Sequence, residues 1–428
     1  MVHKLTTADK RFAAQFSTFL TLRESTEQDV SGVVKGIIAR VRSEGDKALF
    51  ALSEQFDHVQ LSAASIRVSK QEIAKARKTC GKNVLAALTH AAKRIRKYHE
   101  KQLPANLWYK DKHDVKLGWR WNAMDAVGLY VPGGTASYPS SVLMNAIPAQ
   151  VAGVKRLVMV VPAPKGKLSP AVLAAADIAG VSEIYRIGGA QAVAALAYGT
   201  KSISAVDKIV GPGNAYVAEA KRQVFGKVGI DMIAGPSEIL VVADNKNNPQ
   251  WIAADLLSQA EHDPMAQAVL VTDDAAFAAK VEQAVTQQLK KLSRADIART
   301  SWQQYGAIIV VRNLKEAAVL VDKIAPEHVE LAVSKPEKLA KHIRHAGAIF
   351  MGRFTPEAVG DYIAGPSHVL PTSHTARFSS GLGVYDFLKR TSLIACSKTS
   401  IKTLGRDAAI LADAEGLLAH ALSLRQRL

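Results

Sequence analysis

The chain has 428 residues, and 55 Lys or Arg against 38 Asp or Glu give it a formal net charge of +17. Hydrophobic residues form 48% and charged residues 22% of the chain, which excludes disordered, collagen-like and coiled-coil proteins. At about 100–200 residues per domain, this length predicts two to four domains that each bury a core. The two cysteines, Cys80 and Cys396, are too few for a disulfide-stapled secreted scaffold and favour a reducing compartment.

The ends and apolar stretches of the chain predict neither secretion nor membrane insertion. The N-terminus, MVHKLTTADKRF, has no apolar core segment and therefore predicts no signal peptide. The most apolar region, residues 146–163, is interrupted by Lys155 and Arg156 and falls short of the roughly 20 apolar residues that span a bilayer. We therefore expect no membrane association and a cytoplasmic location.

The positive charge raises the question of nucleic-acid binding. The densest basic run is KRIRKYHEK, residues 93–101, which continues a helical stretch where basic side chains can form a solvated face. Aromatic residues make up only 6% of the chain, and zinc-finger spacing, helix-turn-helix and RNP-type motifs are missing. A basic enzyme that attracts an anionic cofactor explains the charge better, so we expect no nucleic-acid partner.

Residues 1–115 are predicted to be mostly helical and to pack on the core. Valine and isoleucine side chains between residues 30 and 41 recur at helical spacing and form one apolar stripe. Thr26 is predicted to cap this helix, with Asp29 three residues later in the position of a capping box. Nothing in this region points to catalysis.

A first α/β domain is predicted over residues 116–236, where short apolar runs alternate with helical segments. The predicted strands are AVGLYV (126–131), RLVMVV (156–161), EIYRIG (183–188) and AVDKIVG (205–211). The predicted helices span residues 140–153, 169–179, 190–198 and 213–225. This alternation indicates a parallel sheet that is covered by helices on both faces.

A second α/β domain of similar build is predicted over residues 237–380. Its strands are EILVVA (238–243), AVLVT (268–272), AIIVV (307–311), HVELAV (328–333) and AIFMG (348–352). A Gly/Pro/Ser-rich stretch, residues 355–383, is typical of a loop. Residues 381–428 are predicted to form a helical C-terminal tail with one amphipathic helix from about 406 to 427. The expected fold class is α/β, with two Rossmann-like parallel-sheet domains.

Glycine-rich loops accompany these strands at the positions where open parallel sheets bind ligands, beyond the C-terminal strand ends. The loops are YVPGGTASYPSS (130–141), GGAQAV (188–193), GPGNAYVAEA (211–220) and AGPSE (234–238). Glycine lets the backbone approach a ligand, and a following helix N-terminus favours phosphate, so the loops indicate a nucleotide or another anion. The G-x-G-x-x-G fingerprint is absent, because GPGNAY breaks it at Tyr216. Simple tight turns are the alternative interpretation.

Two pairs of polar residues lie on predicted helices. Asn248 caps a predicted helix, and Gln259 and His262 share a face near its end, where they can hold a divalent metal. Glu415 and His420 lie on the predicted terminal helix, five residues apart, so they diverge on its surface. When each pair is taken alone, capping or structural residues are the more frequent explanation for the first pair, and solvated polar residues are the alternative for the second.

Two further segments combine carboxylates with imidazoles. Glu327 and His328 begin a predicted strand and form an acid/base couple, because imidazole titrates near pH 6.5. Asp361 and His368 lie in the Gly/Pro-rich loop, a setting that favours function over packing. A polar strand edge is the alternative interpretation of the first pair.

Taken together, these segments resemble the histidinol dehydrogenase family. The resemblance covers essentially the whole chain, is strongest from residue 127 to residue 392, and rests on YVPGG, GGAQA, GPGN, AGPSE, LLSQAEH, PEHVEL, GPSHVLPT and EGLLAHA in the family's order. Several long motifs in register are highly specific. One departure is Ser367, where Asn is more usual, and it puts the local hydrogen bonding in doubt without removing His368.

The resemblance implies an enzyme that oxidises L-histidinol to L-histidine through the aldehyde and reduces two NAD, as the last step of histidine biosynthesis. His328 would be the general base for the alcohol proton, and Glu327 would activate the water that hydrates the aldehyde. One zinc ion per site would orient the substrate. The resemblance also implies a homodimer with an exchanged tail, in which Glu415 and His420 complete the partner subunit's site.

The resemblance also assigns the contacting residues. The metal ligands would be Gln259, His262, Asp361 and His420. The substrate would contact Ser237, His328, His368 and Glu415, together with these metal ligands. The nicotinamide dinucleotide would contact Tyr130, Gln191 and Asn214.

Three alternatives stay open from the sequence. A relative that oxidises a sulfonated diol would share the metal and the Glu-His pair, but the carboxylate of Glu415 suits a cationic imidazole better than a sulfonate. A nucleic-acid-binding protein would bind DNA or RNA in a salt-sensitive way and need no zinc. A zinc hydrolase would use metal and glutamate to activate water, and would leave the four glycine-rich loops without a role.

Overall fold

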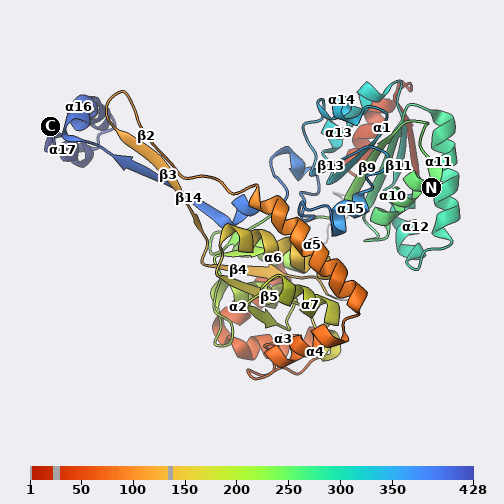
Figure 1. Ribbon diagram of the computed structural model, residues 1–428, viewed down its shortest axis with the longest axis horizontal. Helices are drawn as coiled ribbons and strands as arrows, with labels where there is room; N and C mark the ends of the chain where they lie inside the picture. The colour runs from red at the N-terminus through yellow and green to blue at the C-terminus, as the bar shows by residue number, and fades with distance from the viewer. Residues whose placement is uncertain (1, 23–28, 134–137) are drawn as a thin grey trace.

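Two parallel sheets, each flanked by helices, and one antiparallel sheet make up the fold (Figure 1). The computed structural model describes residues 2–22, 29–133 and 138–428, so the predicted cap Thr26 lies outside the described residues. The two helix-covered sheets lie next to each other, and the antiparallel sheet projects as an arm that ends at the C-terminus (Figure 1). Among the described helices, none is both long and apolar enough to cross a membrane.

The first parallel sheet forms from the predicted apolar runs, with one short strand at its edge that was not predicted. Its strands are β4 (Ala126–Tyr130), β5 (Arg156–Val160), β6 (Glu183–Tyr185), β7 (Lys208–Val210) and β8 (Gly229–Ile230), in the order β6-β5-β4-β7-β8. The helices between and after these strands are α6 (Pro139–Ala152), α7 (Pro170–Ile178), α8 (Gly189–Tyr198) and α9 (Ala215–Val224), and a short 3-10 turn, η2, spans Pro164–Gly166. Every residue of β4 is buried, as expected for a central strand that is covered on both faces.

The N-terminal helices cover both faces of this first sheet. They are α2 (Ser31–Glu44), α3 (Asp46–Asp57), α4 (Lys70–Thr79) and α5 (Lys82–Glu100). The apolar stripe of α2 is buried in one core cluster with side chains of α8, whereas α4 and α5 pack in the other cluster, with α6 and α7. The predicted stripe at residues 30–41 therefore forms and meets the sheet's covering helices.

The second parallel sheet has six strands. They are β1 (His3–Thr6), β9 (Glu238–Ala243), β10 (Gln267–Thr272), β11 (Ala307–Val310), β12 (His328–Ala332) and β13 (Ala348–Met351), in the order β1-β11-β10-β9-β12-β13. Its helices are α1 (Phe12–Leu20), α10 (Pro249–Ala260), α11 (Ala275–Leu289), α12 (Ala295–Gln304), α13 (Leu314–Ile324), α14 (Pro336–Ala340) and α15 (Glu357–Tyr362). The parallel sheets confirm the α/β class.

Strand β1 was not predicted, and it ties the chain's first residues to the second sheet rather than to the helices that follow them. It pairs in parallel with β11, with His3 opposite Ala307 and Thr6 opposite Val310. The partner is about 300 residues away in sequence, so no local pattern marks this segment as a strand.

The tail differs from the single helix that was predicted. Strand β14 (Leu388–Ala395) pairs antiparallel with β3 (Lys116–Ala123), which also pairs with β2 (Leu107–Lys110). Two helices then follow, α16 (Lys398–Ala414) and α17 (Leu418–Arg425). Gly416 has φ 73°, a left-handed conformation that ends a helix, and this break separates the two helices. Two 3-10 turns, η3 (Thr375–Arg377) and η4 (Val384–Phe387), lie before β14.

Candidate functional site

His328 opens strand β12 and is held in one orientation by the neighbouring strand β9. Its Nδ1 lies 2.8 Å from the backbone oxygen of Glu238. Because a carbonyl oxygen only accepts, Nδ1 must donate, and the neutral ring then carries its lone pair on Nε2. The imidazole is buried, and its Nε2 has no hydrogen-bond partner among the described residues. The strand start therefore presents a neutral imidazole with a free basic nitrogen.

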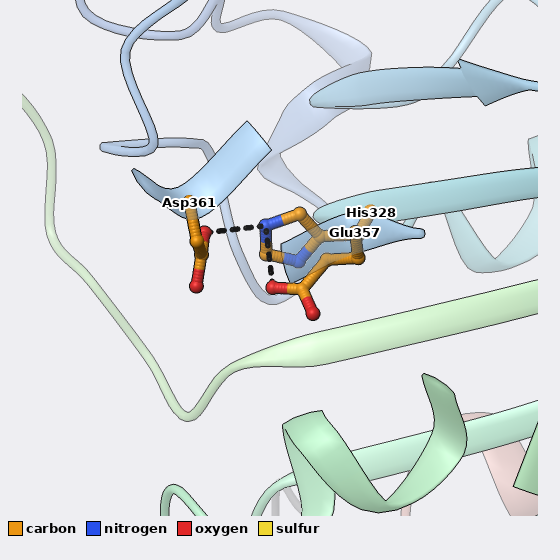
Figure 2. Close-up of side chains that lie close together, drawn as sticks. All are labelled: His328, Glu357 and Asp361. Atoms are coloured by element: carbon orange, nitrogen blue, oxygen red, sulfur yellow. Dashed lines mark ion pairs between the residues drawn. The ribbon is translucent and has the colours of Figure 1, made fainter. Parts of the chain in front are cut away.

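Two carboxylates face that nitrogen (Figure 2). The Nε2 atom of His328 lies 3.7 Å from Oε1 of Glu357 and 3.9 Å from Oδ1 of Asp361. Both carboxylates belong to α15, and their spacing of four residues puts them on one face of the helix. One ligand atom from each of the three residues lies within 4.8 Å of the others, an arrangement that can hold a metal ion.

Burial shifts the protonation of this cluster. The pKa of His328 is lowered to about 4: desolvation is the largest cause, the charges of His368 and His262 act in the same direction, and Glu357 opposes them. Desolvation raises the pKa of Glu357 to about 7, where Asp361 adds to the effect, and raises the pKa of Asp361 to about 6. Without a cation, His328 is therefore neutral at pH 7. Its pKa lies well below the ordinary imidazole value of about 6.5 that was expected from the sequence.

A second layer of buried acids supports α15. Glu330 of β12 accepts a hydrogen bond from the backbone nitrogen of Glu357, and Ser258 of α10 donates to the Glu357 carboxylate at 3.1 Å. Burial raises the pKa of Glu330 well above its usual range, with the charge of Asp255 acting in the same direction. Burial also raises the pKa of Asp255 to about 6. The buried carboxyl groups on and behind α15 are therefore too close together to be all ionised without a cation.

Gln259 and His262 lie at the end of α10, which packs against α15. Asn248 caps the start of α10 as predicted, by accepting from the backbone nitrogen of Gln250. Gln259 is only 1% exposed, yet its Oε1 has no partner among the residues that the structure describes. His262 follows the helix and is near enough to influence the pKa of His328.

Unpartnered buried atoms provide a test of whether a metal fits. Oε1 of Gln259, Nε2 of His328 and Oε1 of Glu357 are all buried without a hydrogen-bond partner in the described part of the chain. Buried polar atoms in folded proteins usually have partners, and two of these atoms, Nε2 of His328 and Oε1 of Glu357, lie 3.7 Å apart, where one bound ligand could satisfy both. Nitrogen and oxygen donors of this kind suit zinc or a similar borderline ion. The donor set therefore fits a divalent metal.

Glu357 is the residue of this cluster that sequence reasoning missed. A signal was present, because two carboxylates four residues apart precede the GPSH stretch. The residue lies in a segment that was predicted to be a loop, and helical spacing is not informative for a loop. Its side chain nevertheless lies closer to Nε2 of His328 than that of Asp361 does.

His368 joins the second sheet's residues to the first domain. Its Nδ1 donates to the backbone oxygen of Asp361 at 2.9 Å, so its Nε2 accepts from the hydroxyl of Ser141 at 3.2 Å. Ser141 belongs to α6, in the YPSS stretch, and had not been singled out. Ser367 donates to the backbone oxygen of Met144 at 3.3 Å, which anchors the loop to the same helix. The site thus contains residues from both α/β domains.

Glu327 and Ser237 lie at the starts of the two central strands, β12 and β9. Glu327 accepts from the backbone nitrogen of Glu238 at 3.0 Å, and Glu238 accepts from that of Glu327 at 3.2 Å, so the two carboxylates clamp the strand starts reciprocally. Ser237 accepts from the backbone of Gln267 at 2.9 Å. The AGPSE loop therefore precedes β9 and lies at an N-terminal strand end. It also follows the C-terminal end of β8, because the chain crosses there from the first sheet to the second.

Three of the glycine-rich loops meet at the C-terminal edge of the first sheet. The hydroxyl of Tyr130 accepts from the backbone nitrogen of Gly189, and Asn214 caps α9 by accepting from Val217. Tyr130 and Gln191 are buried, whereas Asn214 is exposed. Residues 134–137 of the predicted loop 130–141 lie outside the described residues.

Glu415 and His420 lie in a different part of the molecule. Glu415 ends α16 and His420 belongs to α17, and both side chains are exposed. These helices form the end of the arm, away from α10 and α15 (Figure 1). A single chain therefore packs α10, which ends near Gln259 and His262, against the helix that carries Asp361, and leaves α17 with His420 apart from both. The single helix that was predicted to carry both tail residues is also interrupted between them, at Gly416.

Comparisons with known proteins agree with these features. The family model for histidinol dehydrogenase matches residues 20–428. A histidinol dehydrogenase from Rhodospirillum rubrum is 60% identical over 99% of this chain and 98% of its own, and one from Mesorhizobium japonicum is 58% identical over the full length of both chains. A crystal structure of histidinol dehydrogenase from Elizabethkingia anophelis superposes with a TM-score of 0.95 at 34% identity, covering 100% of this chain and 98% of that one.

The sequence match, the relatives and the solved structure each extend over almost the whole chain. This chain therefore belongs to the histidinol dehydrogenase family, the oxidoreductases that serve histidine biosynthesis.

Proposed function

We propose that this protein oxidises L-histidinol to L-histidine through the aldehyde, with two molecules of NAD reduced for each histidinol consumed. One observation carries the proposal: the tautomer of His328 is set by the backbone of β9, so that its free Nε2 faces the cluster of Glu357 and Asp361. A neutral imidazole whose lone pair points into a buried polar site is suited to accept a proton.

We propose that His328 accepts the alcohol proton in the first oxidation and acts again on the aldehyde hydrate in the second. Glu327, buried beside it with Oε2 3.7 Å from Nδ1 of His328, is proposed to take a proton from the water that hydrates the aldehyde. NAD, when bound, accepts a hydride in each oxidation. Burial of both groups supports a site that retains the aldehyde between the two steps.

The metal proposed for this site is a single zinc ion held by Gln259, His262, Asp361 and His420 of the partner subunit. When bound, it would orient the amine and imidazole of the substrate as a Lewis acid. Glu357 lies beside Asp361 and is proposed to hold charge next to the metal rather than to replace one of the four ligands. The unpartnered oxygen of Gln259 supports this set.

The two α/β domains are proposed to divide the work. Residues 116–236 would bind NAD through Tyr130, Gln191 and Asn214, and residues 237–380 would hold the metal and carry out proton transfer. Substrate contacts are proposed at Ser237 and His368, with Glu415 of the partner subunit facing the cationic imidazole. A carboxylate at that place favours histidinol over a sulfonated alcohol.

A homodimer with an exchanged tail is proposed because the arm offers apolar surface to a partner. Leu411, Leu418 and Leu422 are 66%, 71% and 55% exposed on α16 and α17, and further apolar side chains are exposed along β2. Exposed apolar area of this kind favours association. The exchange would also bring His420 to a site that one chain leaves incomplete.

We also propose a cytoplasmic location for this protein. Cys80 is buried and Cys396 exposed, and both are free thiols, which suits a reducing compartment.

The test of the reaction is NADH formation from L-histidinol by the purified protein, measured before chelation, after chelation and after zinc is restored. We expect two NADH for each histidinol, loss of the signal on chelation and recovery with zinc. An absence of turnover with zinc and NAD present would contradict the substrate assignment. A control with the histidinol omitted excludes reduction from other sources.

The test of the exchange is a mixture of two inactive variants. His262→Ala and His420→Ala damage opposite sides of the same proposed metal site. In an exchanged mixed dimer, one of the two sites receives the intact His262 of one subunit and the intact tail of the other. Refolding the variants together should therefore restore about a quarter of wild-type activity, since about half the dimers are mixed. No restoration would show that each tail serves its own subunit.

A further inference from the structure

One buried ion pair in the first domain has no part in the reaction described above. Lys221, in α9, pairs with Asp231, which follows β8, and the two side chains are only 2% and 1% exposed. Removing two charges from water is costly, so such a pair by itself is weak evidence of a contribution to stability. What the pair contacts indicates its role more clearly.

Both partners hold the same residue of the glycine-rich loop. Nζ of Lys221 donates to the backbone oxygen of Gly211 at 3.0 Å, and the backbone nitrogen of Gly211 donates to Oδ2 of Asp231 at 2.7 Å. Asp231 is itself attached to the sheet through its backbone nitrogen, 3.3 Å from the oxygen of Ile209. The hydrogen bonds on either side of Gly211 fix both of its backbone dihedral angles.

Gly211 needs that restraint. Its φ is 110°, a conformation that only glycine adopts readily, and a Cβ atom at this position would lie 2.1 Å from the backbone oxygen of Tyr130. Glycine also has the largest conformational freedom to lose, so a loop built on it is ordered only where other groups hold it. Gly211 leads directly to Asn214, which caps α9. The pair therefore restrains the chain at Gly211, beside Tyr130, from which it continues to Asn214.

We propose that Lys221 and Asp231 are positioning residues for dinucleotide binding, which hold the loop 211–214 in its binding conformation. The inference rests on the proposed role of Tyr130 and Asn214 in binding NAD. It adds two buried residues, neither of which is expected to touch the cofactor. Their effect is exerted through the backbone of Gly211.

The experiment compares NAD binding in Lys221→Met, Asp231→Asn and the double variant K221M/D231L with that in the full-length wild type. We expect the Kd and the KM for NAD to rise about tenfold or more, while the KM for histidinol stays within about twofold. A general loss of structure would change both KM values. Arg156→Met is the matched control, because Arg156 pairs with Glu183 at 2.8 Å at the opposite, N-terminal edge of the same sheet.

The double variant keeps the proposal testable where a single variant fails to fold. It replaces both charges by apolar groups of similar size, a change that often preserves stability because no buried charge is left unpaired. A folded double variant with wild-type NAD affinity would overturn the positioning role. So would a failure of the double variant to fold, because the pair would then support the domain as a whole.

These outcomes separate the inference from the proposed function. A wild-type protein that does not bind NAD in a calorimetric titration contradicts the proposed function. A wild type that binds NAD, with affinity unchanged in the double variant, contradicts only the role of Lys221 and Asp231. An equal rise of the NAD KM in Arg156→Met would show that any lost ion pair has this effect, and would also overturn the inference.

Discussion

The two parallel sheets use opposite edges for their proposed sites, and different chemical groups line each edge. The first sheet presents its C-terminal edge, where glycine-rich loops and backbone groups gather around Tyr130 and Gly211. The second presents the N-terminal starts of β9 and β12, where Glu327 and His328 are buried with the carboxylates of α15. One edge is built from backbone and the other from titratable side chains.

The direction of the helices explains this difference. In a βα unit the helix runs back along the sheet, so its N-terminus lies at the C-terminal edge of the strands and its C-terminus lies at the opposite edge. Helix N-termini favour anions and helix C-termini favour cations. Thus α8 and α9 begin at the edge proposed for NAD, whereas α10 ends at Gln259 and His262, beside the proposed metal. The same βα arrangement thereby provides one site that favours anions and one that favours cations.

The largest effect is expected from removing His328, the central residue of the side-chain site. His328→Ala should lower kcat by roughly 10²–10⁴-fold, the usual contribution of a general base, with the KM for NAD little changed. Steady-state NADH formation measures both parameters. His342→Ala, an exposed histidine of the same domain, is the control and should retain wild-type kcat. A kcat for His328→Ala within a few-fold of wild type would remove His328 from the proton transfer.

The backbone site should be broken by a single methyl group. Gly211→Ala meets the backbone of Tyr130 and should destabilise the protein by about 3 kcal/mol, from a steric clash added to left-handed strain. Gly226 also has a positive φ, 95°, but nothing lies within 4 Å of its Cβ position. Gly226→Ala should therefore cost only about 1 kcal/mol. Urea denaturation of both variants measures the difference, and equal losses would rule out the clash as the cause.

The acidic layer behind the side-chain site should make stability fall as pH rises. The folded-state pKa values of Glu330, Asp255 and Glu357 are raised, so the folded chain holds protons that the unfolded chain releases. Their stabilisation is complete below the unfolded pKa values of about 4 and is lost as pH rises through about 6 and 7. Urea denaturation of chelator-treated protein between about pH 7 and about pH 9 should show this loss, because the buried His328 is neutral in the folded chain and mostly neutral in the unfolded chain across that range.

Glu330→Gln tests the origin of that slope. Removing one charge should flatten the pH dependence and stabilise the metal-free protein at pH 8 by on the order of 1 kcal/mol. Glu337→Gln, an exposed residue on the nearby helix α14, should leave the slope unchanged. An unchanged slope in Glu330→Gln would show that the buried acids are not its source.

The smallest effects are expected from removing two helix caps, Asn248 in the second domain and Asn214 in the first. Asn248→Ala removes the cap of α10 and should lower the free energy of unfolding by about 1 kcal/mol with activity retained. Asn214→Ala removes the cap of α9 to a similar extent, but should also raise the KM for NAD. Thermal denaturation and NAD titration separate the two effects. A raised NAD KM in Asn248→Ala would mean that lost stability, rather than a lost contact, is responsible.

The sequence alone predicted most strands of both sheets to within a few residues, but it did not predict β1 or the short strand β8. Fully buried strands are nearly continuous apolar runs, as in β9, whose predicted and observed bounds coincide at Glu238 and Ala243. The Glu327-His328 pair was recognised from its motif and does begin β12, as predicted. Glu357 was missed because its segment resembles a loop, and Ser141 because its partner, His368, is 227 residues away.

By itself, the sequence determined what is encoded locally: periodic apolar runs, helix caps, glycine turns and the motifs that identify the family. Tertiary structure alone decided which distant segments meet. It placed β1 beside β11, fixed the tautomer of His328 through the backbone of Glu238, and lowered the imidazole pKa by burial. It also set α17, which carries His420, apart from α10 and α15 (Figure 1). These properties depend on solvent exclusion and on contacts between segments far apart in the chain, and no local pattern carries either.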